Sequence, residues 1–269
     1  MSTLEVVVAQ TPAELEGPQA RFEWLVESLK LEIMQGADLL LLPELFLTGY
    51  NIGSNVKEWG ETTDGPYAKQ IALLCQQHDI AIHYGFSEKD CSEDRNYNSA
   101  NCISRKGIRL AGHRKLLLPP GFEGDHFSGG DSFETFSING FKIGTLICYD
   151  AEFPENFRHI ALKGVDLVLV PTALSSSWGV VAHQVIPTRA FENGVFVCYA
   201  NQAGNEYGLE YLGASCIIAP DGSELQRAGS SSDFLRATLS QSQVVDAQKR
   251  LPYLQDMRRL SESIISDKP

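Results

Sequence analysis

Two short apolar runs constrain the fold of this chain more than any other feature. They are "GADLLLLPEL" at 36–45 and "GVDLVLVPTA" at 164–173. A glycine, an aspartate and a proline recur at matching places in both runs: Gly36, Asp38 and Pro43, then Gly164, Asp166 and Pro171. Runs this short and this apolar are typical of strands buried on both faces in α/β proteins. The repetition predicts two similar α/β halves packed on each other, although two unrelated strand–helix units could also converge on it.

The rest of the chain alternates predicted strands with predicted helices and contains no low-complexity segment or linker. With 43% hydrophobic residues, 269 residues can build a substantial core, and we expect one domain over 1–269. Asn139-Gly140 is a favoured type I′ turn pair and predicts a hairpin, and Pro252 breaks a helical C-terminal stretch. Helices are expected at 18–35, 67–78, 154–163 and 180–193, and strands at 4–10, 37–44, 80–86 and 165–172.

Composition excludes several classes of protein. The formal net charge of -12 disfavours nucleic acid as a partner, because phosphate binding needs a basic surface. No apolar run approaches the roughly 20 residues that cross a bilayer, and no signal peptide is recognisable, so we expect a cytoplasmic protein without a membrane partner. The six cysteines include no C-x-x-C pair and the six histidines no H-x-x-x-H pair. The sequence therefore predicts neither a metal site nor a cofactor.

Three residues could carry chemistry. Glu44 follows an apolar strand, where burial would raise its pKa and suit a proton carrier, or it is an acid at a helix N-terminus. Lys115 could stabilise a developing oxyanion or protect an edge strand. Cys148 lies at a predicted strand–helix junction, where a thiolate is favoured, or it is a buried structural cysteine. A Cys–His hydrolase that pairs Cys148 with His126 or His183 is a further alternative.

The segments "PELFLTGY", "HRKLLLP" and "GTLICYDAEFPE" occur in this order, and together they resemble the nitrilase, or carbon–nitrogen hydrolase, superfamily. The resemblance covers nearly the whole chain. It implies a four-layer α-β-β-α sandwich of two similar halves with a Glu-Lys-Cys triad. By this resemblance Glu44 is the general base, Lys115 the cation that stabilises the oxyanion, and Cys148 the nucleophile. Glu123, in the loop after the lysine, matches a second glutamate of many members.

True nitrilases of this superfamily have Trp-Glu directly after the cysteine, whereas this chain has Tyr149-Asp150, which is similar to the amidase and carbamoylase branches. The resemblance implies a thiol amidase that hydrolyses a small aliphatic amide to carboxylate and ammonia through a cysteine thioester. It points to amino-acid-type or ω-amino amides, such as 5-aminopentanamide. The alternatives are an N-carbamoyl amine or amino-acid hydrolase, and a catalytically silent binding module on the same fold.

Residues around the triad carry secondary expectations. The backbone N–H of Tyr149 is expected to help bind the oxyanion, and Trp178 is either a wall of the substrate pocket or a surface-loop aromatic. Asp150 and Glu152 are expected to cap the helix that follows. The resemblance also implies a homodimer or a higher homo-oligomer, with a dimer formed largely by the helices at 154–163 and 180–193. The candidates for its apolar contacts, which could equally face the core, are Phe157, Ile160, Val185 and Ile186.

Overall fold

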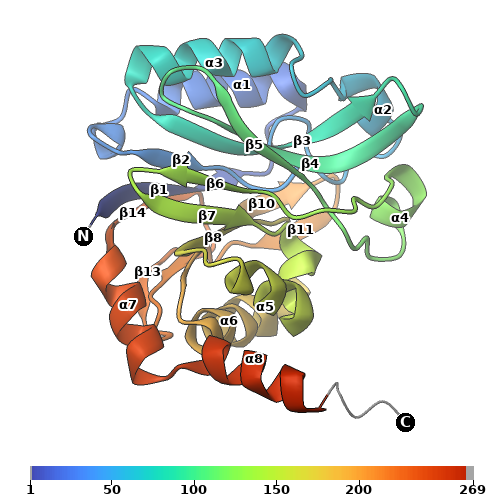
Figure 1. The fold of residues 1–269 in the computed structure, drawn as a ribbon. Coiled ribbons are helices and arrows are strands. Elements are labelled where there is room, and N and C mark those ends of the chain that lie inside the picture. Colours follow the sequence, from blue (N-terminus) through green and yellow to red (C-terminus); the bar gives the residue numbers. More distant parts are fainter. Residues whose placement is uncertain (1, 265–269) are drawn as a thin grey trace.

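The computed structural model describes residues 2–264, with side-chain surroundings for residues 2–260. Two β-sheets lie face to face, and helices cover the outer side of each (Figure 1). The helices α1 (Gly17–Ser28) and α3 (Pro66–His78) cover the first sheet, and α5 (Pro154–Leu162) and α6 (Ile186–Asn193) cover the second. This arrangement is the predicted four-layer α-β-β-α sandwich.

Each sheet has a parallel centre. The strands β1, β2 and β3 run parallel in the first sheet, and β7, β8 and β9 in the second, as strands joined by crossover helices must. The first sheet has the order β11 (Leu209–Leu212), β10 (Gln202–Glu206), β1 (Thr3–Pro12), β2 (Leu39–Leu41), β3 (Ala81–Asp90), β4 (Arg95–Ile103), β5 (Arg109–Arg114). The second has the order β13 (Glu224–Arg227), β12 (Cys216–Ile218), β9 (Phe196–Ala200), β8 (Leu167–Pro171), β7 (Phe141–Thr145), β6 (Thr135–Ile138).

The central strands are apolar throughout because both of their faces are covered. Leu39 of β2 packs between the two sheets, whereas its neighbour Leu40 packs under the outer helices. In the same way, Leu167 of β8 points between the sheets and Val168 points toward the helices of the second half. Successive side chains of a strand alternate between faces, so a strand in the middle of four layers has no solvent face.

The internal repeat has a structural counterpart at the start of each strand. Asp38 precedes β2, and its carboxylate accepts the backbone N–H of Glu5 at 2.9 Å. Asp166 precedes β8, and its carboxylate accepts the backbone N–H of Lys142 at 2.9 Å. Each aspartate therefore ties its strand to the preceding parallel strand, and the two halves are built alike at this point.

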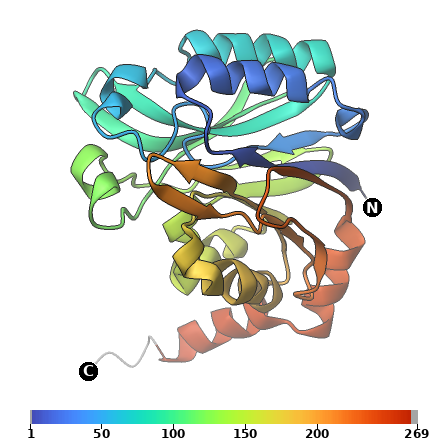
Figure 2. The same ribbon diagram turned by 180° about the vertical axis from the view of Figure 1, so that it is seen from behind.

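Three elements differ from the expected ones. The helix expected at 18–35 ends at Ser28, because Leu31 is extended and a separate 3-10 turn (Glu32–Met34) follows. The helix expected at 180–193 is a π-helical turn (Val181–Val185) that continues into α6. The strand β14 (Asp233–Ser240) is not evident from its sequence, which lacks an apolar run. This segment forms a strand because it pairs antiparallel with β1. The chain returns there beside the dark blue N-terminal strand (Figure 2).

The C-terminal tail is broken at Pro252, as predicted. It forms α7 (Gln241–Arg250) and α8 (Tyr253–Ile264), which lie along the second half (Figure 1). Across residues 2–264, neither these helices nor any others are long and apolar enough to span a membrane.

Three of the four candidates for a dimer interface face the core, which is the other role considered for them. Phe157, Ile160 and Ile186 are fully buried in the core between the second sheet and its helices. Their surfaces are used within the chain, so they cannot also contact a second subunit. Only Val185 of the four is partly exposed.

Candidate active site

Glu44 lies in a turn directly after β2, at the carboxyl end of a parallel strand. The turn is bonded to β3, where the backbone N–H of Gly85 donates to the carbonyl of Pro43 at 3.2 Å. Position 85 needs a glycine, because a Cβ there would lie 2.4 Å from the backbone nitrogen of Leu45. This close packing holds the fully buried side chain of Glu44 at the edge of the sheet, where parallel α/β sheets carry their sites.

Lys115 lies between two carboxylates. Its Nζ donates to Glu44 Oε1 at 2.7 Å and to Glu123 Oε1 at 2.6 Å, and all three side chains are fully buried. Lys115 directly follows β5, and Glu123 lies in the short helix α4 (Phe122–His126). The lysine therefore connects three separate segments of the chain. An ammonium has three N–H donors, so these two bonds leave one donor for another acceptor.

Two further polar side chains belong to this cluster, and sequence reasoning missed both. Asn98 on β4 donates through Nδ2 to Glu44 Oε1 at 2.7 Å and to Glu123 Oε2 at 3.1 Å. The hydroxyl of Tyr50 donates to Glu123 Oε1 at 2.8 Å. Tyr50 closes the same "PELFLTGY" segment that contains Glu44, and that proximity was the available signal. Nothing in the sequence around Asn98 distinguishes it from other polar strand residues.

The charges of the cluster set its protonation states. Burial raises the pKa of Glu44 to about 7, with Lys115 opposing this shift and Glu123 adding to it. Burial alone would lower the pKa of Lys115, but the charges of Glu44 and Glu123 outweigh it and raise that pKa. The lysine therefore stays an ammonium, while Glu44 exchanges its proton near neutral pH. The second oxygen of Glu44, Oε2, is buried with no hydrogen-bond partner among the described residues.

Cys148 begins the 3-10 helix η2 (Cys148–Glu152), shortly after β7. Its φ of 45° lies in the left-handed region that few residues other than glycine adopt. The side chain is half-buried and lines a pocket together with Glu123. Burial and the charge of Glu44 raise the pKa of the thiol, and Lys115 only partly opposes them. The thiol therefore keeps its proton at rest, contrary to the thiolate that a helix N-terminus alone would favour.

Asp150 connects the cysteine turn to the lysine segment. Its fully buried carboxylate accepts the backbone N–H groups of Leu116 and Leu117 at 3.1 and 2.9 Å, and that of Ile147 at 3.3 Å. His113 Nε2 lies 3.2 Å from the same carboxylate. Because Leu116 follows Lys115 and Ile147 precedes Cys148, Asp150 sets the distance between these two residues. The expectation that it caps the helix α5 is wrong, since its bonds go to segments that precede that helix.

The pocket that contains Cys148 has a volume of about 500 Å³, which lies in the range of small-molecule sites. Tyr149 and Trp178 both line it, and Trp178 is 60% exposed, so this indole lies at the mouth of the pocket and belongs to the surface as well. His126 and His183, the alternatives for a Cys–His pair, do not line it. The remaining lining residues are Tyr50, Pro119, Pro120, Glu123, Glu152, Ala173, Leu174, Ser175, Val181 and Leu209.

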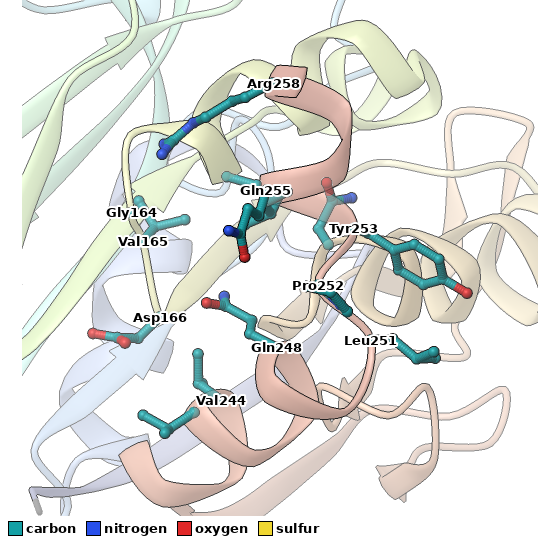
Figure 3. Close-up of a pocket in the computed structure, with 14 residues that line it drawn as sticks. Gly164, Val165, Asp166, Val244, Gln248, Leu251, Pro252, Tyr253, Gln255 and Arg258 are labelled. Atoms are coloured by element: carbon teal, nitrogen blue, oxygen red, sulfur yellow. The ribbon is translucent and has the colours of Figure 1, made fainter. Parts of the chain in front are cut away.

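A separate cavity of about 330 Å³ lies between the C-terminal tail and the second half (Figure 3). Two of its polar side chains bind backbone groups. Gln248 donates to the carbonyl of Gly194 at 3.2 Å, and Arg258 donates to the carbonyl of Leu162 at 3.0 Å. The cavity therefore belongs to the attachment of α7 and α8 to the body of the protein.

Residues 6–249 match the family model described as carbon-nitrogen hydrolase, and the chain belongs to this family. It is an enzyme that hydrolyses carbon–nitrogen bonds of the amide type. Among relatives, it is 43% identical over 224 residues to "Hydrolase in pqqF 5'region" of Pseudomonas protegens, covering 82% of this chain and 78% of the relative. It is 34% identical over 222 residues to an (R)-stereoselective amidase of Pseudomonas sp, covering 82% and 80%.

Solved structures agree with the family assignment. A variant of the Nesterenkonia AN1 amidase from the nitrilase superfamily superposes with a TM-score of 0.85 at 28% identity, covering 97% of each chain. A second structure of that amidase, at the same TM-score and identity and covering 98% and 97%, shows the acetamide moiety of fluoroacetamide added covalently at the active-site cysteine. A third, covering 97% and 96%, is a complex with acrylamide, again at 0.85 and 28%.

Proposed function

We propose that the chain is a thiol amidase that hydrolyses small aliphatic amides, with Cys148 as nucleophile, Glu44 as general base and Lys115 as the oxyanion-stabilising cation. The observation that carries this proposal is the buried Oε2 of Glu44, which has no partner among the described residues, while Oε1 is held by Lys115 and Asn98. A carboxylate with only a structural role would have both buried oxygens hydrogen-bonded. The covalent adduct at the cysteine of the Nesterenkonia amidase supports the same chemistry.

In the first half-reaction, Sγ of Cys148 attacks the amide carbonyl carbon while its proton moves to Oε2 of Glu44. This transfer accompanies the attack, because burial and the charge of Glu44 raise the pKa of the thiol and keep it protonated until then. The third N–H of Lys115 and the backbone N–H of Tyr149 stabilise the oxyanion. Glu44 then gives the proton to the amide nitrogen, the C–N bond breaks, ammonia leaves, and a thioester remains.

In the second half-reaction, a water molecule attacks the thioester carbonyl carbon while Glu44 accepts one of its protons. The C–S bond breaks, and the sulfur of Cys148 takes the proton back as the carboxylic acid forms and ionises. Glu123 has a positioning role, since it binds Lys115, Asn98 and Tyr50 at once. Because Glu123 also lines the pocket, it links the ammonium of Lys115 to the pocket wall.

An ammonia-release screen tests this function. We expect release from simple aliphatic amides such as butyramide, with the matching carboxylate as the other product, because the pocket has apolar walls and room for a short acyl chain. N-carbamoyl amines would yield carbon dioxide as well as ammonia, so product analysis separates this runner-up activity. If neither amides, carbamoyl amines nor nitriles yield ammonia, the chain is a binding module and the proposal is wrong.

The pKa of Glu44 predicts an acidic limb in the pH–rate profile. The base must be ionised, and burial raises its pKa to about 7. We therefore expect kcat/KM for butyramide to rise with pH, about tenfold per pH unit below this value, and to level off above it. Lys115 keeps its proton through this range because its pKa is raised. Ammonia release from pH 5 to 9, with circular dichroism at each pH, measures the profile.

A variant of Asn98 sharpens this test. The hydrogen bond from Asn98 lowers the pKa of Glu44, so Asn98→Leu should move the midpoint of the limb to higher pH. A limb centred near 4.5, the ordinary value of a glutamate, would contradict the assignment of Glu44 as the base.

Assembly into a homodimer and a cytoplasmic location stay predictions. Because Phe157, Ile160 and Ile186 belong to the core, a dimer formed by this half has to use other apolar residues. Val180, which precedes α6, and Phe191, within α6, are both exposed. We propose that they contribute to such an interface.

A further inference from the structure

A buried ion pair lies outside the catalytic cluster, and the mechanism above does not use it. Arg21 of α1 is fully buried, and its Nη2 lies 2.9 Å from Oε1 of Glu206, the last residue of β10. Burial lowers the pKa of Arg21, and the charge of Glu206 opposes this shift. Replacing such a pair with well-packed apolar residues is often neutral or stabilising. Stability alone therefore does not explain the pair, but its other hydrogen bonds do.

The ion pair binds the main chain of the segment that also carries the proposed general base. Nη1 of Arg21 donates to the carbonyl of Phe46 at 3.3 Å. The carboxylate of Glu206 accepts the backbone N–H groups of Tyr50 at 3.1 Å and of Asn51 at 2.7 Å. The two charged side chains therefore hold this segment at two places, in each case through main-chain atoms.

Gly49 lies between these two attachment points and allows the ion pair to approach the main chain closely. Its φ is 93°, and a Cβ there would lie 2.5 Å from Oε1 of Glu206 and 3.3 Å from Nη2 of Arg21. Any larger residue would displace the pair from the segment. Tyr211 completes the surroundings of the carboxylate, since its hydroxyl donates to Oε2 of Glu206 at 2.6 Å. The geometry of the segment and that of the ion pair therefore depend on each other.

Tyr50 connects this arrangement to the catalytic lysine. Glu206 binds its main chain, and its hydroxyl donates to Oε1 of Glu123 at 2.8 Å. The same oxygen of Glu123 accepts Nζ of Lys115 at 2.6 Å. A shift of Tyr50 therefore acts on the oxygen that holds the ammonium. Displacing a catalytic group by about 1 Å can cost about 100-fold in rate, so a small movement of the segment is sufficient to affect turnover.

We propose that the Arg21–Glu206 pair has a positioning role: it orients the hydroxyl of Tyr50 toward the oxygen that holds the catalytic ammonium. This inference rests on the proposed amidase function. Neither member of the pair lines the substrate pocket, so neither contributes to substrate binding directly. The ammonium of Lys115 stabilises charge that develops only in the transition state. The pair is therefore expected to affect kcat rather than KM.

Glu206→Gln and Tyr50→Phe test this inference as a double-mutant cycle with butyramide as substrate. Glu206→Gln removes the charge and keeps the size of the side chain, while Arg21 retains the carbonyl of Ala13 and the side chain of Gln202 as acceptors. We expect each single variant to lower kcat by about 10–100-fold, and Glu206→Gln to leave KM unchanged. The double variant should lose little more than the larger single loss, because both changes break the same connection.

Glu61→Gln is the matched control for this cycle. Glu61 is also a buried carboxylate that accepts two backbone N–H groups, those of Tyr67 and Ala68. Its substitution should cost stability and leave the kcat of the folded enzyme unchanged, with circular dichroism confirming the fold. If Glu206→Gln behaves in the same way, or if the losses in the cycle multiply, the inference is overturned and the pair is structural only.

A milder variant applies if Glu206→Gln does not fold. Tyr211→Phe removes one hydrogen bond to Glu206 and leaves the ion pair in place. It should lower kcat by about 3–10-fold, as expected for one lost hydrogen bond to a charged group, and should have no further effect on Tyr50→Phe. Equal losses in both backgrounds would overturn the inference.

Alkylation separates this inference from the proposed function. If the wild type releases no ammonia from any amide, the proposed function is overturned, but labelling of Cys148 by iodoacetamide still reports on Lys115, whose charge favours the thiolate. In a Cys91→Ser background, which removes the exposed cysteine, Glu206→Gln and Tyr50→Phe should each slow labelling by about threefold or more. The double variant should be no slower than the slower single. Unchanged labelling in both single variants would overturn the inference.

Discussion

Cys148→Ala is expected to lower kcat by at least about 10⁴-fold, because no other residue can form the thioester. The substitution removes one small, half-buried side chain, so the fold should survive. Cys148→Ser should be nearly as inactive, since a hydroxyl is much harder to deprotonate than a thiol. Ammonia release measures the loss, and circular dichroism confirms the fold. A folded alanine variant with substantial turnover would falsify the assignment of the nucleophile.

Alkylation provides a second readout of the same residue. Of the six cysteines, Cys91 is exposed, Cys148 is half-buried in the pocket, and the other four are buried. In a Cys91→Ser background, iodoacetamide should therefore label one site in the folded protein. The label should disappear in Cys91→Ser/Cys148→Ala. Labelling of the folded double variant would show that another thiol is accessible and would weaken the assignment.

Glu44→Gln is expected to lower kcat by about 10²–10⁴-fold, because a neutral amide cannot accept the proton of the thiol. A helix-capping acid would behave differently, costing on the order of 1 kcal/mol of stability and leaving kcat unchanged. Glu61→Gln is the matched control, since Glu61 is also a buried glutamate but accepts only the backbone N–H groups of Tyr67 and Ala68. It should affect stability alone. Wild-type kcat in a folded Glu44→Gln enzyme would return Glu44 to a structural role.

Lys115→Met should lower kcat by a comparable factor of about 10²–10³, by removing oxyanion stabilisation. It should also slow alkylation of Cys148, since Lys115 is the cation that opposes the rise in the thiol pKa. The variant leaves the buried carboxylates of Glu44 and Glu123 without their shared partner, so it should lose stability, by about 3–5 kcal/mol for a broken buried ion pair.

The double variant Glu44→Gln/Lys115→Met tests whether the two residues act together. Its kcat should fall far less than the product of the two single losses, as for residues that act as one unit. It should also be more stable than Lys115→Met alone, because only Glu123 then remains as an unpaired buried charge. Multiplicative losses of kcat would indicate that the two side chains act independently.

Much of the fold could be predicted from local sequence patterns. The apolar runs at 36–45 and 164–173 predicted buried strands, because a strand covered on both faces needs an apolar residue at every position. The Asn139-Gly140 pair predicted a hairpin, and both residues have the positive φ that a type I′ turn requires. These features depend on a few neighbouring residues, so the sequence alone was sufficient. The strand β14 was not predicted, because it forms by pairing with β1, which lies more than 200 residues away in the sequence.

Some residues of the candidate site could be predicted from the sequence, and others became evident only in the structure. Glu44, Lys115 and Cys148 were predicted from the motifs that contain them, and Glu123 from its place in the loop after the lysine. The structure brings Glu44, Lys115 and Glu123 into direct contact. The sequence did not reveal Asn98, since its role depends on bonds to residues 54 and 25 positions away. It also could not show that burial and the charge of Glu44 raise the pKa of the Cys148 thiol, because both depend on segments that meet only in the folded chain.

Asp150 and Glu152 illustrate what only the tertiary structure decided. The sequence presents both as acids ahead of a helix, and the two look equivalent there. In the folded chain, Asp150 is buried and bound by backbone N–H groups from two segments, whereas Glu152 faces the pocket without a partner. Sequence determines that a carboxylate is present, but the segments that fold around it determine whether its charge is satisfied internally or faces a pocket.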